Sequence, residues 1–222
     1  MTTPISETHP ATPTQPKAES FVDWFHINSR LVTIGVVVVG LAAFGFWFVQ
    51  RTSLNETINS DKQLLMAKQS LASGNAPLAE SDLKKVADKY AGKPAGAEAA
   101  MLLAQLKMDR GDYAGAAEWL REKTGKVSGP NAPAMHAHLG DALGQLDKPA
   151  EAAAEYERAA GLTAMRNEKS FYLIRAGRAN MAAGKTAESK KIYEGLAAQS
   201  DNEAVATEAR VRLGELAVGV KP

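Results

Sequence analysis

Hydrophobic and polar positions divide the chain into three parts. Residues 31–49 are nineteen consecutive positions without an ionisable side chain. Before them, residues 1–20 contain four prolines among threonine, serine and glutamine, a composition that predicts a disordered tail. After them, from Asn59 onward, alanine, leucine, lysine, glutamate and glutamine are abundant and β-branched alternation is absent, which predicts helices. We therefore expect an all-α chain with a tail, an apolar segment with its approach over 21–51, and a helical domain over 57–222.

The apolar run has the length of a membrane span. Nineteen residues of α-helix at about 1.5 Å each reach roughly 28 Å, close to the hydrocarbon thickness of a bilayer. A helix is expected despite the four consecutive valines, because lipid offers no partner to unpaired backbone amides. Trp24 and Trp47 lie near the two ends, and Arg30 and Arg51 close the segment, as is typical of membrane interfaces. The run is therefore predicted to be a transmembrane helix.

A cleavable signal peptide is the alternative interpretation of this run. Thirty residues precede it and carry acidic side chains such as Glu7 and Asp23, and WFVQRTS at its end has no small-x-small cleavage pattern. An uncleaved signal anchor fits these features better. Basic residues occur on both sides of the run, so the positive-inside rule does not orient it in a membrane.

The remaining sequence repeats itself. Corresponding turn positions recur at intervals of 37, 36 and 37 residues, at Gly74, Gly111, Asp147 and Gly184. Each is followed five positions later by a small residue, at Ala79, Ala116, Ala152 and Ser189, and four positions after that by a large one, at Leu83, Leu120, Tyr156 and Tyr193. Small side chains let two antiparallel helices approach closely, and large ones fill the space between adjacent hairpins. The pattern predicts about four helical hairpins, with VATEARVRLGELAVG as a final capping helix.

These positions resemble the tetratricopeptide repeat. The clearest unit is HLGDALGQLDKPAEAAAEYERAA, which matches the repeat at Leu139, Gly140, Leu143, Ala152, Tyr156 and Ala159. Two features depart from the family pattern. The large aromatic residue usual early in the first helix is replaced by Gln63, Ala100, His136 and Leu173, and the closing proline is missing or displaced. The resemblance implies a solenoid whose first helices line a groove.

Composition and motifs argue against several classes of function. The net charge of +1 argues against a nucleic-acid partner, and the absence of cysteine excludes thiolate chemistry. His136 and His138 point about 200° apart on a helix, so they are not spaced to chelate a metal. The acidic residues are scattered along helices without a paired-carboxylate arrangement, at Asp82, Asp88, Glu98, Glu118 and Glu122. We expect no enzymatic activity, no cofactor, no metal site and no small-molecule substrate.

The whole arrangement resembles the bacterial membrane-anchored ancillary subunit of the Sec translocon. The resemblance rests on a short polar tail, FVDWF before a single span, Trp47 near its far end, and a modest repeat domain. It implies a single-pass inner-membrane protein with its N-terminus inside and a periplasmic domain. It also implies a noncatalytic adaptor whose partners are translocon subunits, chaperones or translocating clients. A self-associating scaffold in envelope assembly or division is the alternative.

The repeat register assigns groove-facing candidates for partner binding. They are Met101, Gln105, Met108, Asp141, Phe171, Ile174, Arg178 and Met181. Methionine adapts to varied partners, and an aromatic and aliphatic strip suits an apolar or helical peptide segment. The alternative is that these side chains fill the core or meet the capping helix, and the sequence leaves both interpretations open.

Overall fold

The computed structural model describes residues 29–199 and 202–219. The predicted tail over 1–20 and the approach to the apolar run lie outside these ranges. Within them the chain is all-α, with nine α-helices, one short 3-10 helix and no strand. The chain divides into two compact units, residues 1–54 and 55–222, which we describe separately.

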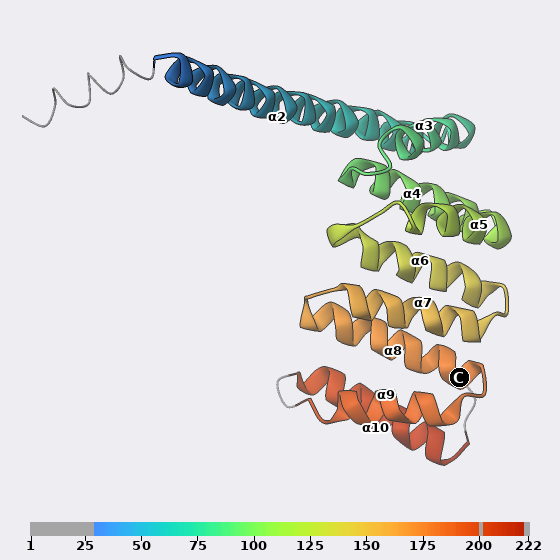
Figure 1. Cartoon of the computed structure of the whole chain (residues 1–222). Coiled ribbons are helices and arrows are strands. Elements are labelled where there is room, and N and C mark those ends of the chain that lie inside the picture. Colours follow the sequence, from blue (N-terminus) through green and yellow to red (C-terminus); the bar gives the residue numbers. More distant parts are fainter. Residues whose placement is uncertain (1–28, 200–201, 220–222) are drawn as a thin grey trace, which may run out of the picture. The chain divides into compact units, whose positions relative to one another are not determined.

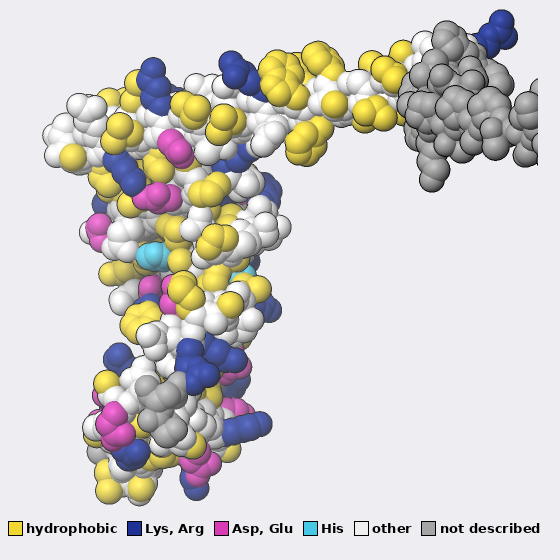
Figure 2. Space-filling view, turned by 90° about the vertical axis from the view of Figure 1, so that its left-hand side faces the viewer, with side chains coloured by type: hydrophobic (Ala, Val, Ile, Leu, Met, Phe, Trp, Pro, Cys, Tyr) yellow, Lys and Arg dark blue, Asp and Glu magenta, His cyan; other side chains and the backbone are white. Residues whose placement is uncertain are grey.

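The first unit consists, in its described part, of the N-terminal portion of α2 (Ser29–Ala72). An 18-residue window of α2 has a mean hydropathy of 2.4 and none of it is buried. Figure 2 shows hydrophobic side chains gathered along this portion. Among the described helices, α2 is the one long and apolar enough to cross a membrane. The expectation of a long apolar helix at 31–49 is confirmed.

The second unit is a stack of helical hairpins followed by one more helix (Figure 1). The C-terminal part of α2 pairs with α3. Ser70 donates a hydrogen bond to Asp82 of α3, and Gln63 donates one to Tyr90, which directly follows α3. The later hairpins pair α4 with α5, α6 with α7, and α8 with α9, and α10 packs against α9. The bounds are α3 (Ala76–Lys89), α4 (Pro94–Asp109), α5 (Tyr113–Thr124), α6 (Ala132–Gln145), α7 (Pro149–Leu162), α8 (Arg166–Ala182), α9 (Thr186–Ala197) and α10 (Glu203–Ala217). The predicted hairpin solenoid with a capping helix is confirmed.

The four predicted turn residues occupy the same backbone conformation. Gly74, Gly111, Asp147 and Gly184 have φ values of 74°, 78°, 55° and 74°. This left-handed conformation ends the first helix of each hairpin and favours glycine, with aspartate among the better-tolerated alternatives. In each hairpin the second helix begins two residues later, and at Asn75 and Asp112 a side-chain oxygen caps it by accepting a backbone N–H. The 37, 36 and 37 residue spacing is thus a spacing of turns.

The small and large positions of the repeat form the core. Every predicted small residue is at most 1% exposed, at Ala79, Ala116, Ala152 and Ser189. The corresponding large residues are also buried, at Leu83, Leu120, Tyr156 and Tyr193. Most of the core forms one continuous cluster from Leu64 to Ala176. A second, smaller cluster at the C-terminal end is defined by its buried members Met181, Tyr193, Leu196 and Ala209, and we call it the C-terminal cluster.

Two of the four positions that lack the usual first-helix aromatic residue form a hydrogen bond with an aromatic residue from elsewhere in the domain. At Ala100 on α4, the backbone carbonyl accepts a hydrogen bond from Trp119 Nε1 of α5 at 3.0 Å. At Gln63, the side-chain amide donates to the Tyr90 hydroxyl, just after α3, at 2.9 Å. An aromatic residue of α5 and one directly after α3 thus contact two of these four first-helix positions through hydrogen bonds.

Candidate functional site

A groove crosses the first helices of three successive hairpins. It encloses about 650 Å³, within the size range of small-molecule and peptide sites. Its lining comes mostly from α4, α6 and α8, with further residues from α5 and α7. We call it the central groove, lined by Gln105, Met108, Asp109, Tyr113, Asp141, Gly144, Gln145, Asp147, Pro149, Ala152, Tyr156, Arg175, Arg178, Ala179 and Ala182.

Half of the predicted groove residues line this groove, namely Gln105, Met108, Asp141 and Arg178. The other four lie elsewhere. Met101 is half-buried against the main core cluster, while Phe171 is 54% exposed and lies outside the lining. Ile174 is half-buried and packs against the C-terminal cluster, and Met181 is only 8% exposed within that cluster.

The capping helix explains the positions of Ile174 and Met181. The C-terminal cluster contains Ala209 of α10, and Val205, Leu213 and Leu216 of α10 pack against it. These apolar side chains cover the end of the last hairpin, so Ile174 and Met181 meet the capping helix instead of facing the central groove. This is the alternative that the sequence left open for these two residues.

Asp141 is the centre of a polar network in the groove. Its Oδ1 atom accepts a hydrogen bond from the Tyr156 hydroxyl at 2.7 Å and a second one from the Arg175 guanidinium. The Arg175 guanidinium carbon also lies 4.7 Å from the centroid of the Tyr156 ring and 5.5 Å from that of Phe171. Cation–π contacts and a charge-assisted hydrogen bond thus hold three helices, α6, α7 and α8, in register.

Sequence reasoning missed Arg175 and the groove-lining role of Tyr156. A signal for Arg175 existed in the repeat register, because the corresponding positions are Leu65, Leu102 and His138. A charged side chain where two other repeats carry leucine needs a polar partner, and the first helix of the preceding hairpin supplies Asp141.

Protonation states in the network follow from burial. Burial raises the pKa of Tyr156 to about 12, so the phenol stays protonated and donates its hydrogen bond. Burial and the neighbouring Arg175 charge lower the pKa of His138. Its Nδ1 atom lies 4.0 Å from Asp141 Oδ2, too far for a hydrogen bond, and finds no partner among the described residues. His138 is therefore neutral near pH 7.

The two histidines do not share a site. His136 Nδ1 lies 2.6 Å from Glu155 Oε2 on α7, whereas His138 lies beside Asp141 and Arg175. In the described part of the chain, no three His, Cys, Asp or Glu side chains are grouped closely enough to hold a metal ion.

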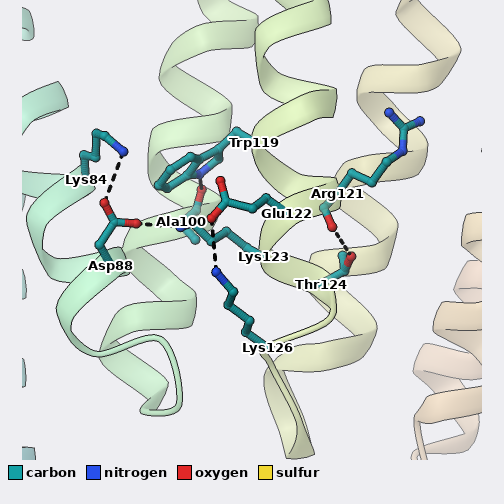
Figure 3. Close-up of polar contacts among 9 residues, drawn as sticks. All are labelled: Lys84, Asp88, Ala100, Trp119, Arg121, Glu122, Lys123, Thr124 and Lys126. Carbon is teal, nitrogen blue, oxygen red and sulfur yellow. Dashed lines mark hydrogen bonds and ion pairs between the residues drawn. The ribbon is translucent and has the colours of Figure 1, made fainter.

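A second polar cluster joins α3 to α5 (Figure 3). The buried Lys123 ammonium donates to Asp88 at 2.5 Å and to Glu122 at 2.9 Å, and lies 4.2 Å from the centroid of the Trp119 ring. Burial lowers the pKa of Lys123, but the hydrogen bonds to the two carboxylates outweigh it and leave the pKa raised. Lys84 also bonds to Asp88 at 3.1 Å. Two of the predicted scattered carboxylates thus meet, but around a lysine that pairs with both, which makes the cluster a structural link.

Comparison with known proteins identifies the class. The chain matches the tetratricopeptide repeat-like domain family over residues 23–135 and again over residues 57–174, and it belongs to this family. Repeats of this kind form scaffolds for protein interactions, and the fold is typically noncatalytic. The first match begins ahead of the apolar run, so the matched region includes that run as well as the first hairpins.

Solved structures agree with this fold. The chain is similar to the nearly identical TPR-like repeats of a kinesin light chain protein from Podosopora anserina and to a second form of that protein that carries one substitution. In each case the identity is 18%, the TM-score is 0.55, and the match covers 70% of this chain and 84% of the other. No curated protein sequence matches this chain.

Proposed function

We propose that this protein is a noncatalytic adaptor, anchored in a membrane by the N-terminal part of α2, whose repeat domain binds other polypeptides through the central groove. The observation that carries the proposal is the combination of two features in one chain. One is an apolar helix segment of spanning length with no buried residue in its most apolar window, and the other is a repeat stack with an open groove.

The anchor is supported by the exposure of the apolar side chains. Leu41, Phe44, Phe46 and Val49 are each at least 61% exposed, and no described segment of the chain covers them. Leaving a continuous apolar surface in water is unfavourable, whereas a bilayer solvates it and the helix satisfies its own backbone hydrogen bonds. The anchor leaves the repeat domain beside the membrane, where membrane-associated partners are concentrated.

Peptide binding is supported by the mixed chemistry of the central groove. Met108 and Ala182 provide apolar contact area, and Gln105, Asp109 and Arg178 provide hydrogen-bonding or charged groups. The Asp141 network holds the groove walls in place, so a partner segment would bind a preformed surface. Phe171 adds an exposed aromatic side chain on α8, in contact with Arg175.

The proposed location is a bacterial inner membrane, with the N-terminus inside and the repeat domain in the periplasm. The proposed partners are subunits of the Sec translocon, periplasmic chaperones or translocating clients. This part of the proposal rests on the resemblance in architecture: a short polar tail, aromatic residues before a single span, and a repeat domain of about four hairpins.

Cross-linking in intact membranes tests the adaptor function. Phe171→Asp and Arg178→Asp are expected to reduce cross-links to translocon or chaperone subunits, because they remove an aromatic contact and reverse a groove charge. Val211→Asp on α10 is the matched control, since Val211 is 53% exposed and Phe171 54%. Met181 is unsuitable as a test position because an aspartate there would enter the core. Recovery of no translocon or chaperone partner by the unaltered chain would contradict the proposal, and cross-links only between copies of the chain would favour the scaffold alternative.

Protease treatment of spheroplasts tests the orientation separately. We expect the repeat domain to be digested from outside while the inner membrane is still intact. Protection of the domain in intact spheroplasts, with digestion only after lysis, would place it in the cytoplasm and remove the periplasmic partners from consideration.

A further inference from the structure

The first hairpin exposes an apolar surface on the C-terminal part of α2. Ile58, Leu65 and Met66 are 58%, 67% and 52% exposed, and Lys62 lies between them in the sequence and is also exposed. Positions separated by three, four and seven or eight residues share one side of a helix, so these four side chains form one surface. We call it the α2 face. It is distinct from the central groove, whose lining includes no residue of α2.

In the other hairpins, the residues that correspond to Met66 and Lys62 are buried. Met66 corresponds to Leu103, Leu139 and Ala176, which are 1%, 2% and 0% exposed. Lys62 corresponds to three other buried core residues, Ala99, Met135 and Tyr172. These positions are buried because each later first helix is covered by the second helix of the preceding hairpin, as α3 covers α4, α5 covers α6 and α7 covers α8. At Lys62 and Met66, the α2 face is therefore a stacking surface without its covering helix among the described residues. Leu65 is next to them in the sequence and corresponds to the half-buried Leu102, His138 and Arg175.

The opposite end of the stack is closed. There α10 covers the last hairpin with Val205, Ala209 and Leu213, while charged side chains such as Arg210 remain exposed. Terminal repeats are normally protected by such polar-faced caps. The chain thus builds a cap at its C-terminal end, whereas the α2 face keeps three large apolar side chains exposed.

From this geometry we infer that the α2 face binds an amphipathic helix of another protein, which takes the place that α3, α5 and α7 occupy on the later first helices. The charge of Lys62 indicates what the partner helix must carry. Lys62 forms no ion pair among the described residues, and it stands where the other repeats bury Ala99, Met135 or Tyr172. A covering helix that buried Lys62 beside an apolar residue would leave a charge unpaired, so the partner helix carries an aspartate or glutamate opposite Lys62.

The same lysine disfavours a second copy of this chain as the occupant. Two identical α2 faces paired about a two-fold axis centred on this surface would bring both Lys62 ammonium groups together. Like charges in a partly desolvated interface oppose association. Lipid phosphates would also pair with Lys62, but a lipid surface would not occupy the position that α3, α5 and α7 take on the later first helices, and the experiment below distinguishes it.

Two cross-linking chemistries on the full chain in its native membrane test the inference. A photoreactive phenylalanine replaces Met66, and in a second experiment a carbodiimide couples the Lys62 amine directly to a neighbouring carboxylate. In the control, the photoreactive phenylalanine replaces Val211 on α10, which is 53% exposed against 52% for Met66. Mass spectrometry identifies the cross-linked residues, and mixing isotopically labelled and unlabelled chains identifies contacts between copies.

We expect both reagents to join the α2 face to the same helical segment of a different protein, with an aspartate or glutamate coupled to Lys62. Lys62→Glu is expected to reduce the Met66 photoproduct by about fivefold or more, because it places like charges opposite each other. The inference is overturned by cross-links between two copies, to residues 1–28 of the same chain, or to lipid alone, and equally by a Met66 yield no higher than that at Val211. Arg178→Asp alters the groove and leaves the α2 face unchanged, so loss of groove binding and loss of this contact are distinguishable.

Discussion

The first two hairpins and the last two solve the same packing problem with different pairs of residues. In the first two, a buried leucine on the second helix, Leu83 or Leu120, is accompanied by alanine at the matching first-helix position, Ala67 or Ala104. In the last two, the leucine is replaced by Tyr156 or Tyr193 and the alanine by a glycine. The larger ring thus accompanies the smaller partner.

The glycines are needed because the tyrosine rings lie against the first helices. A Cβ atom at Gly140 would lie 2.7 Å from Tyr156 Cε1, and one at Gly177 would lie 2.6 Å from Tyr193 Cζ. Protein interiors are close-packed, so such an overlap forces the ring or the helix to move. The comparison teaches that the repeat conserves the total volume across a pair of positions and leaves the individual residues free to change.

The largest effect is expected from adding a methyl group in the last hairpin. Gly177→Ala should lower the free energy of unfolding by about 1–3 kcal/mol, because the overlap with a fully buried ring outweighs the gain in helix propensity. Adding Tyr193→Leu to Gly177→Ala recreates the leucine and alanine pair of the first hairpins and should restore much of the loss. Urea denaturation of the single and double variants measures the coupling.

Ala104→Gly provides the control in the second hairpin. It should cost about 1 kcal/mol from helix propensity and lost contacts, and Leu120 offers no ring to use the space. If the Gly177→Ala and Tyr193→Leu losses simply add, the two positions do not share a volume and the comparison fails.

The two tyrosines differ in their hydroxyl groups, and this predicts the next effect. Tyr156→Phe removes the 2.7 Å hydrogen bond to the Asp141 carboxylate and should destabilise the protein by about 1.5 kcal/mol. The loss should appear as a lower denaturation midpoint at an unchanged m-value, because the denatured state is unaffected. An unchanged midpoint would show that Arg175 alone satisfies Asp141.

Tyr193→Phe should have a smaller effect. The buried Tyr193 hydroxyl has no hydrogen-bond partner among the described residues, so its removal relieves a desolvated polar group. We expect a change within about 0.5 kcal/mol, or a small gain in stability, in the same denaturation experiment. A loss as large as that of Tyr156→Phe would mean that the Tyr193 hydroxyl does find a partner in solution.

The smallest effect is a dependence of stability on pH through His138. Its folded-state pKa is lowered, so between the unfolded value near 6.5 and the folded value the unfolded chain binds more protons. The contribution of neutral His138 is complete above about pH 6.5 and is lost as the pH falls through the folded pKa. His138→Leu, which copies Leu102 of the second hairpin, should flatten the unfolding free energy between pH 8 and 5. Identical slopes for the variant and the unaltered protein would assign that dependence to other groups.

Local chemistry made the turns and the core predictable from sequence. A glycine or aspartate that precedes each second helix satisfies a backbone requirement on its own, and the small and large positions follow at fixed offsets. The groove was predictable in part, because register places Gln105, Met108, Asp141 and Arg178 on the first helices. Whether those residues bind a partner stays a prediction.

The remaining features depend on contacts between distant residues. Arg175 meets Asp141 from 34 residues away, and Lys123 meets Asp88 from 35 residues away. The repeat register marks Arg175 as unusual, but neither partner is specified by residues nearby in the sequence. The repeat register predicts that Met181 faces the groove, but the packing of α10 buries it in the C-terminal cluster. The position of the capping helix decides whether such a residue faces the groove or is buried. The amphipathic periodicity of the capping helix does not specify which side chains of the last hairpin it covers.

The division of the core into two clusters has a consequence for how the domain opens. The C-terminal cluster has four buried members and is defined separately from the long cluster that runs through the earlier hairpins. In a linear array, each hairpin is stabilised chiefly by its neighbours, so terminal elements can melt while the middle stays folded. Amide hydrogen exchange should therefore be graded along the chain, with α9 and α10 losing protection before α6 and α7.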